Sequence, residues 1–447
     1  MQEVDSSALL DRAAELVDRA GRAGATAADA AVSRSRSLSV GVRNGKVEDT
    51  DASETDRLSL RVFVGDRVAS VSADSDGADL ETLCQRAVAM AKVSPEDRYA
   101  SLAPSELLAR DFPDLDLVDD TEIGSERLVE DALATEAAML DVEGVSQSGG
   151  TGTYVARSGL VLATSHGFAG SYSGTSHGRS ASAIAGEGTG MERDYESSRR
   201  RHYDMLDAAE DVGRRAGERA VKRLGGRKID TTKAAVVFDP RVARGGLATF
   251  ASAINGASVA RGTTFLKERM GELVFPETVT IVDDPHLPRM AGSRVFDGEG
   301  VRGARLELVS QGVLRSWLLS TAIANELGLT TNGRGVRSGS SVGASTTNIW
   351  MEPGERSPEE LIRDIGTGLY VTEMIGRGAD IVTGDYSRGA SGYWIENGEL
   401  TYPVTEVTVA STLQHMFAEL MVANDLDRHY SVAAPTFAIP DVTIAGR

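Results

Sequence analysis

A short polar segment in the C-terminal half holds several side chains that could do chemistry. Residues 384–389 read GDYSRG and place an acid, a phenol, a hydroxyl and a guanidinium between two glycines, in the order Asp385, Tyr386, Ser387, Arg388 and Gly389. These groups could pair locally and hold a polar turn. They could also form a polar loop along a cavity, where an extended peptide would gain affinity from main-chain hydrogen bonds.

The segment leads into a predicted β-hairpin. Asn397-Gly398 stands between two runs of alternating apolar residues, a pattern typical of a two-residue hairpin turn. Pro403 interrupts the second run, and the apolar parity differs between Leu400 and Val407. A proline cannot donate a ladder hydrogen bond, so we expect a bulge or a sheet edge near Pro403.

The histidines are the first candidates for a metal site. Zinc sites hold several His, Cys or carboxylate ligands close together, commonly with two histidines on one face of a helix. No histidine pair here has that spacing, and the two that could meet across a hairpin, His166 and His177, have no carboxylate within a few residues. We therefore predict no metal ligands in this chain. The six histidines are His166, His177, His202, His286, His415 and His429.

Other catalytic motifs are missing from the sequence. No G-x-S-x-G motif stands in a strand–turn–helix setting, and the glycine-rich stretches lack the lysine of a phosphate-binding loop. The single cysteine, Cys84, falls on the apolar face of a predicted helix, which favours a buried core residue over a nucleophile. We predict no catalytic residue from these patterns.

The composition is that of a globular protein with a strongly acidic balance. Hydrophobic residues make up 41%, and 66 acidic against 47 basic residues give a net charge of −19. Such a charge disfavours direct nucleic-acid binding and contact with anionic membranes. No apolar run is long enough to span a membrane, and the N-terminal stretch MQEVDSSALLDRAAELVDRAG lacks the apolar core of a signal peptide. With one cysteine and no possible intrachain disulfide, we expect a cytoplasmic protein.

The order of predicted elements indicates an α+β fold. We expect an N-terminal domain of helices on an antiparallel sheet over residues 1–110, a middle helix and Gly/Ser-rich strand domain over 111–227, and a β-rich C-terminal domain over 228–447. Apolar spacing predicts a helix over 411–423, whereas the glycine-rich residues 330–345 are predicted to form a loop.

Long stretches of the sequence resemble the TldD/PmbA family of peptidase-related proteins. The run GLYVTEMIGRGADIVTGDYSRGASGYWIENGELTYPVTEVTVA, residues 368–410, is similar to the family's C-terminal signature. Further matches are SRVFDGEGV (293–301), GVLRSWLLSTAIANELGL (312–329), GLATFASAINGASVARGTTFLKERMGE (246–272) and VRNGKVEDTDASETDRLSLRVFVGDRVASVSADS (42–75). The resemblance covers nearly the whole chain. One departure is TVASTLQHMF, where the family usually continues TIAGN.

The resemblance implies which branch of the family this is. TldD-like members carry an H-E-x-x-x-H motif on a helix, whose histidines hold zinc together with a distant cysteine and whose glutamate is the general base. The corresponding residues 247–252 read LATFAS, and no histidine or carboxylate stands between Asp239 and Glu268. The chain thus resembles the TldE (PmbA) branch, which lacks the motif. This implies no cofactor in this chain and zinc in a TldD-like partner.

The resemblance also implies a function. We expect a non-catalytic subunit that, with its partner, forms the peptide-binding chamber of a cytosolic metallopeptidase for small unfolded peptides. The C-terminal domain would be barrel-like, and Asp385, Tyr386, Ser387, Arg388 and Gly389 would line the chamber. One alternative is a metal-free homodimeric peptide-binding or regulatory module. Another keeps catalysis in this chain through His166 and His177.

Overall fold

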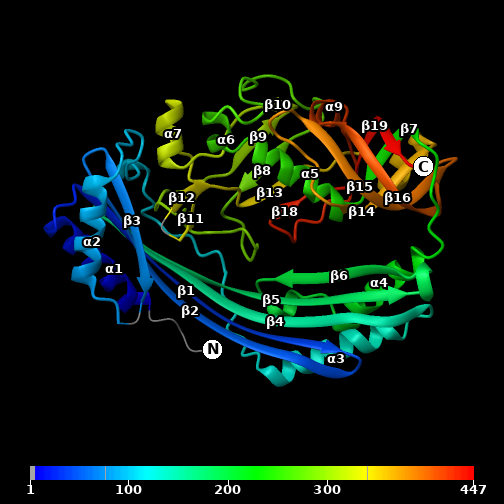
Figure 1. The fold of residues 1–447 in the computed structure, drawn as a ribbon, viewed down its shortest axis with the longest axis horizontal. Coiled ribbons are helices and arrows are strands. Elements are labelled where there is room, and N and C mark those ends of the chain that lie inside the picture. Colours follow the sequence, from blue (N-terminus) through cyan, green and yellow to red (C-terminus); the bar gives the residue numbers. More distant parts are fainter. Residues whose placement is uncertain (1–5, 76, 340) are drawn as a thin grey trace.

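The computed structural model describes residues 6–75, 77–339 and 341–447, and the residues before Ser6, which belong to the acidic N-terminal stretch, lie outside it. Figure 1 shows two layers: a long twisted sheet with helices along it, and a C-terminal lobe above the sheet. In the described part of the chain, no helix combines the length and the apolar character needed to cross a bilayer. These layers confirm the predicted α+β class.

The long sheet is antiparallel and has the strand order β3-β2-β1-β4-β5-β6. The Gly/Ser-rich residues 144–190 supply β4 and β5, as predicted, because small side chains still alternate between the two faces. The domains predicted over residues 1–110 and 111–227 both contribute strands to this sheet. The boundary between these two domains remains a prediction. The strands are β1 (Ala27–Arg43), β2 (Lys46–Val64), β3 (Arg67–Asp74), β4 (Val145–Thr164), β5 (Ala169–Ala185) and β6 (Glu192–Arg200).

Helices cover the outer face of the sheet, away from the C-terminal lobe (Figure 1). On β1 and β2 the alternate residues Ala30, Val32 and Leu60 belong to the core under the first two helices, which includes Cys84. The 0% exposure of Cys84 fits the expected core role. The residues between them, such as Ala31 and Ser59, face the C-terminal lobe; we call this the inner face. The helices are α1 (Ser6–Arg22), α2 (Leu80–Val93), α3 (Ser125–Leu140) and α4 (Ala209–Lys222).

The C-terminal lobe contains a small barrel and a second sheet. Strand β16 pairs with β19 as well as with β15, which closes β7, β14, β15, β16 and β19 into a five-stranded barrel, as the barrel-like prediction required. The barrel strands and the short β17 are β7 (Thr232–Phe238), β14 (Gly368–Ile375), β15 (Asp385–Glu396), β16 (Glu399–Thr412), β17 (Met421–Val422) and β19 (Phe437–Ala445). The second sheet has β8 (Ile281–Asp284), β9 (Leu306–Ser310), β10 (Val313–Leu314), β13 (Asn348–Met351) and β18 (Val432–Ala433).

Short helices connect these strands. The longest of them follows β7 and packs against the main core of the lobe through Leu247 and Phe250. They are α5 (Pro240–Ala253), α6 (Gly256–Ala260), α7 (Thr321–Leu327), α8 (Pro358–Ile365) and α9 (Leu413–Ala418).

The predicted hairpin is confirmed, but two local predictions are wrong. Asn397 and Gly398 have φ of 54° and 79°, as a two-residue turn requires, and the register shifts on the strand opposite Pro403. Residues 330–345 are not only loop, because β11 (Gly335–Ser338) and β12 (Ser341–Ala344) form a hairpin, with Ser340 outside the described residues. The helix predicted over 411–423 is only α9, since residues 411–412 continue β16.

Candidate functional site

The predicted polar loop is the start of a barrel strand. Asp385 pairs with Thr412, and the strand continues with hydrogen-bonded partners on β16 and, from Gly389, on β14. The prediction of a loop is therefore wrong, because residues 385–388 pair with residues 409–412 of β16, which are distant in sequence. Side chains on a strand alternate between two faces, so Tyr386 and Arg388 lie on one face and Asp385 and Ser387 on the other.

Tyr386 belongs to the core of the lobe. Its side chain lines an apolar cavity of about 20 Å³ between β15, α5 and α9, together with Leu247 and Phe417. That volume holds roughly one water molecule, and its apolar walls offer a water little to bind. Burial raises the pKa of Tyr386 to about 12, so the phenol stays protonated near neutral pH and is no general base. The cavity is a packing feature, too small for a peptide.

Arg388 and the two residues on the opposite face are the accessible part of the segment. Arg388 is half-buried beside α5, and its Nη2 lies 3.5 Å from the carbonyl oxygen of Met374. Its Nε has no hydrogen-bond partner among the described residues. Asp385 and Ser387 are exposed. The five residues thus do not gather around one cavity.

Helix α5 occupies the place where the resemblance puts the metal helix. Asp239 caps it by accepting a hydrogen bond from Arg241 N at 2.9 Å, and Pro240 begins the helix. The hydroxyls of Thr249 and Ser252 donate to carbonyls one turn earlier. Its residues supply no imidazole, thiolate or carboxylate, and zinc needs three or four such ligands. The helix does not fit a zinc site.

No other part of the described chain compensates for this. Among residues 6–75, 77–339 and 341–447, no group of three or more His, Cys, Asp and Glu side chains is arranged to hold a metal ion. Cys84 lies under the long sheet, far from α5 along the chain and in a different core cluster. We therefore derive no chemical step through a metal held by this chain.

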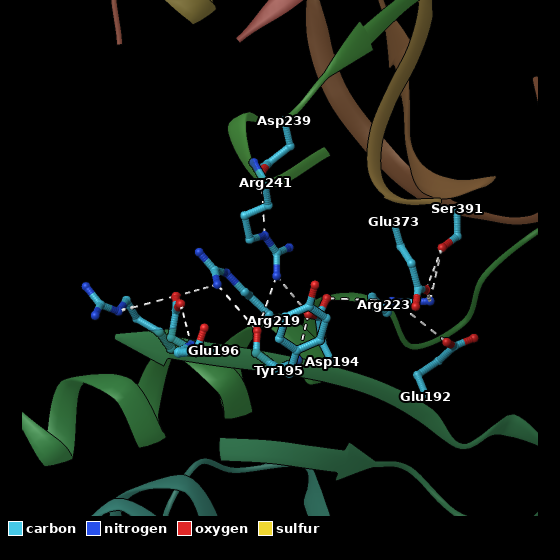
Figure 2. A network of polar contacts seen from close by, with 12 residues as sticks. Glu192, Asp194, Tyr195, Glu196, Arg219, Arg223, Asp239, Arg241, Glu373 and Ser391 are labelled. Carbon is cyan, nitrogen blue, oxygen red and sulfur yellow. Dashed lines mark hydrogen bonds and ion pairs between the residues drawn. The ribbon is translucent and has the colours of Figure 1, made fainter. Parts of the chain in front are cut away.

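A network of ion pairs fixes the start of α5 against the edge strand β6 (Figure 2). Arg241 Nη1 lies 3.0 Å from Asp194 Oδ1 on β6. Burial alone would lower the pKa of Arg241, but the carboxylates of Asp194 and Asp239 outweigh it and raise the pKa. Tyr370 on β14 donates to Asp239 at 3.0 Å. The network therefore ties α5 to both the long sheet and the barrel.

A second branch of the network reaches the barrel strands directly. Arg223, just after α4, lies 2.6 Å from Glu373 on β14 and donates to Ser391 on β15 at 3.0 Å. Glu373 also accepts a hydrogen bond from Ser391 at 3.1 Å. Figure 2 shows these groups converging between the two layers. These contacts attach β14 and β15 to the long sheet.

The two histidines that could have met across a hairpin do not. His166 lies in the turn after β4 and makes a 3.0 Å hydrogen bond with the carbonyl of Ala103, whereas His177 is well along β5, opposite Val155. His177 instead lies 3.3 Å from Asp119. Burial lowers the pKa of His177, although Asp119 acts in the opposite direction. The sequence shows no carboxylate within a few residues of His177, and the one that the fold brings beside it, Asp119, is distant along the chain.

A buried pair of carboxyl groups was missed by sequence reasoning. Asp297 and Glu299 are only 1% and 3% exposed. Asp297 accepts backbone hydrogen bonds from Val301 and Gly335, among others, and Glu299 accepts one from Thr321 at 2.7 Å. Burial raises the pKa of both, and the Asp297 carboxylate contributes to the shift of Glu299. The only signal in the sequence was the alternation of acid and glycine in DGEG.

Comparison with known proteins supports the resemblance over nearly the full length. Three family models match: PmbA/TldA metallopeptidase domain 1 over residues 28–91, the central domain over 119–224 and the C-terminal domain over 231–446. The protein named metalloprotease PmbA from Escherichia coli O157:H7 is 36% identical, and the match covers 94% of this chain and 92% of the relative.

The chain belongs to the PmbA/TldA metallopeptidase family.

Solved structures of similar fold extend the comparison. A Bacteroides thetaiotaomicron protein described as a modulator of DNA gyrase superposes with a TM-score of 0.91 and 26% identity, covering 99% of this chain and 100% of that one. TldE from Thermococcus kodakarensis superposes with a TM-score of 0.86 at 19% identity, over 97% of this chain and 99% of that one, which shows a shared fold. Family membership confirms the resemblance inferred from residues 368–410, and the PmbA relative is of the branch that it implied.

In this member of the PmbA/TldA family, α5 carries no zinc-ligating side chain but is well packed. Ala243, Leu247 and Phe250 keep its apolar face buried in the lobe. Gly246 lies close to Phe437 of β19, since a Cβ at Gly246 would be 3.1 Å from the Phe437 ring. The contacts of its buried face therefore hold α5 in place within the lobe.

Proposed function

We propose that this chain is the metal-free subunit of a metallopeptidase complex. A TldD-like partner of the same family would supply the zinc, and this chain would complete the chamber that admits small unfolded peptides. The observation that carries the proposal is the composition of α5, which lacks every kind of zinc ligand in a chain that keeps the family fold. Cys84 is the only cysteine, which favours a reducing, cytosolic location.

The packing of α5 supports a structural role for this helix. Arg241 and Asp239 anchor its first turn to β6 and β14, so its position is fixed relative to both the long sheet and the barrel. This helix can serve as a rigid wall beside the partner's metal helix. A wall of that kind requires a fixed position and no chemistry of its own.

The start of β15 is the proposed peptide-facing surface. Asp385 and Ser387 are exposed, Arg388 has an unpaired Nε among the described residues, and Gly389, paired with β14 and β16, presents no side chain. Tyr386 supports this surface from the core without contacting peptide. Such a surface can guide an extended chain through a few polar contacts.

A second candidate is a metal-free homodimer that binds peptides or acts as a regulator. It is favoured by a large arginine-lined groove between the long sheet and the C-terminal lobe. All residues of this groove belong to this chain, so a ligand could bind there without a partner subunit. The net charge of −19 argues against DNA as the ligand of such a module.

Native mass spectrometry of the tagged chain, isolated gently from its own host, tests the proposal. We expect this subunit together with a second chain of similar size and one zinc ion in the complex. Zinc analysis of the separated subunits should then locate the metal in the partner. A metal-free homodimer would support the second candidate, and zinc retained by this chain alone would contradict both.

A further inference from the structure

A large hollow lies between the inner face of the long sheet and the C-terminal lobe. Its volume is about 420 Å³, which is in the range of small-ligand sites. Strands β1, β2, β4 and β5 form one wall, and the segment around Arg294 together with β11 forms the other. In Figure 1, β11 and β12 lie above the β1–β2 end of the sheet.

A smaller hollow of about 290 Å³ continues along β4 and β5 on the same face of the sheet. It shares Leu160, Tyr172 and Arg294 with the larger hollow, so the two form one elongated depression, which we call the arginine groove. Its described lining residues include no Asp or Glu, in a chain with 66 acidic residues. The arginines in its walls are Arg57, Arg201, Arg294 and Arg337.

Two of these arginines have donors to spare. Arg294 donates from Nη1 to the carbonyl of Gly335 at 3.2 Å, whereas its Nε and Nη2 are buried with no hydrogen-bond partner in the described part of the chain. Arg57 is exposed at the mouth of the groove, and no described residue pairs with it. Buried donors without an acceptor carry a free-energy cost that an acidic ligand would remove.

The other arginines are held in place and shape the walls. Arg337 lies 2.8 Å from Asp29 Oδ1. Arg201 donates to main-chain carbonyls, including that of Ala291 at 2.7 Å. These pairs leave Arg294 and Arg57 as the two guanidinium groups that face an incoming anion.

We infer that the arginine groove binds the carboxylate of a peptide, with Arg294 at the floor and Arg57 at the mouth. This deepens the proposed function and rests on it, because every substrate and product of a peptidase carries a terminal carboxylate. Paired guanidinium N–H groups match the two oxygens of a carboxylate. Strands β1, β4 and β5 are central, with their backbones paired on both sides, so recognition here comes from side chains.

A peptide fits this groove better than a polyanion does. The chain carries −19 overall, and long-range repulsion grows with the charge of the ligand. A short peptide with one or two carboxylates meets little repulsion, whereas a nucleic acid meets a large one. The small floor residues Gly159, Ser173 and Gly174 leave room for a chain to lie along β4 and β5.

Isothermal titration calorimetry on the isolated full chain tests this inference without partner or zinc. The probe is the hexapeptide SGASGA with a free C-terminal carboxylate, and it is compared with its C-terminal amide and with an amide carrying one glutamate. We expect the free acid to bind at least about tenfold more tightly than the plain amide. Binding of the glutamate-containing amide would show that a side-chain carboxylate serves as well.

Charge-removing variants locate the site. Arg57→Gln and Arg294→Gln should each weaken binding of the free acid by about tenfold, and Arg57→Gln keeps the test valid if Arg294→Gln fails to fold. Arg86→Gln, at an exposed position of α2 on the other side of the sheet, is the matched control and should bind normally. Equal binding of acid and amide, an equal loss in Arg86→Gln, or tighter binding of inorganic phosphate than of the acid peptide would overturn the inference. None of these results depends on whether the mass measurement finds a partner.

Discussion

Arg241 Nη1 lies 3.0 Å from Asp194 Oδ1, and this contact joins the first turn of α5 to the edge strand of the long sheet. The side chains are 16% and 5% exposed, so the pair is largely removed from water. Asp194 also lies 3.6 Å from Arg223, which makes this one carboxylate the meeting point of two cationic groups. The contact connects the two layers of the molecule.

Removing that carboxylate should loosen the attachment of the C-terminal lobe. Asp194→Ala leaves Arg241 and Arg223 partly buried without their shared partner, so we expect a loss of roughly 3 kcal/mol in unfolding free energy. Urea unfolding followed by circular dichroism measures it. Asp211→Ala removes an exposed ion pair with Arg214 and should cost less than about 1 kcal/mol. Similar losses in the two variants would mean that the network does not hold the layers together.

Two helical glycines should respond in opposite directions to the same substitution. A Cβ at Gly213 of α4 would lie 2.0 Å from the carbonyl oxygen of Thr135 in α3, whereas a Cβ at Gly21 of α1 meets nothing within 4 Å. Gly213→Ala should destabilise by roughly 1–3 kcal/mol because the helices must separate. Gly21→Ala should stabilise by about 0.5–1 kcal/mol through helix propensity. Thermal unfolding compares them, and a stabilised Gly213→Ala would contradict the close approach of α3 and α4.

The buried Glu299 predicts a dependence of stability on pH. Burial and the Asp297 carboxylate raise its pKa from 4.5 to about 7, so the folded chain holds a proton that the unfolded chain has released. The contribution of Glu299 to stability is therefore fully present below about pH 4.5 and is lost as the pH rises to about 7, by on the order of 1–3 kcal/mol.

Urea unfolding from pH 5 to 8 measures this dependence. Glu299→Gln should remove much of the decrease, because a neutral amide has no charge to bury, and it should be more stable than the native chain at pH 8. Glu218→Gln, at an exposed position of α4, is the control and should leave the slope unchanged. A Glu299→Gln profile that runs parallel to the native one would show that this carboxyl is not the cause.

Neighbouring residues at the start of β15 should differ sharply in their effect on stability. Tyr386→Ala removes a ring from the core beside α5 and should cost roughly 3–5 kcal/mol, while Tyr386→Phe keeps the packing. Ser387→Ala, on the exposed face, should change stability by less than about 0.5 kcal/mol. Chemical unfolding of the three variants gives the comparison. A large cost for Ser387→Ala would place its side chain, and not that of Tyr386, in the core.

Local patterns predicted well wherever the signal was short in range. The hairpin predicted from Asn397-Gly398 is present, and its turn needs only two residues with positive φ. Predictions failed where distant partners decided the outcome. Residues 385–388 look like a loop in isolation, yet pairing with residues 409–412 of β16 makes them a strand and shortens the helix predicted after it.

The family, the acidic balance and the lack of zinc ligands in residues 240–253 could all be predicted from the sequence, because they depend only on which residues are present and in what order. Which charged side chains contact one another depends on the tertiary structure. Asp194 and Arg241 are 47 residues apart, and Arg57 and Arg294 reach one groove from opposite layers. Such contacts follow from the closure of the sheet and the barrel, and no local periodicity encodes them.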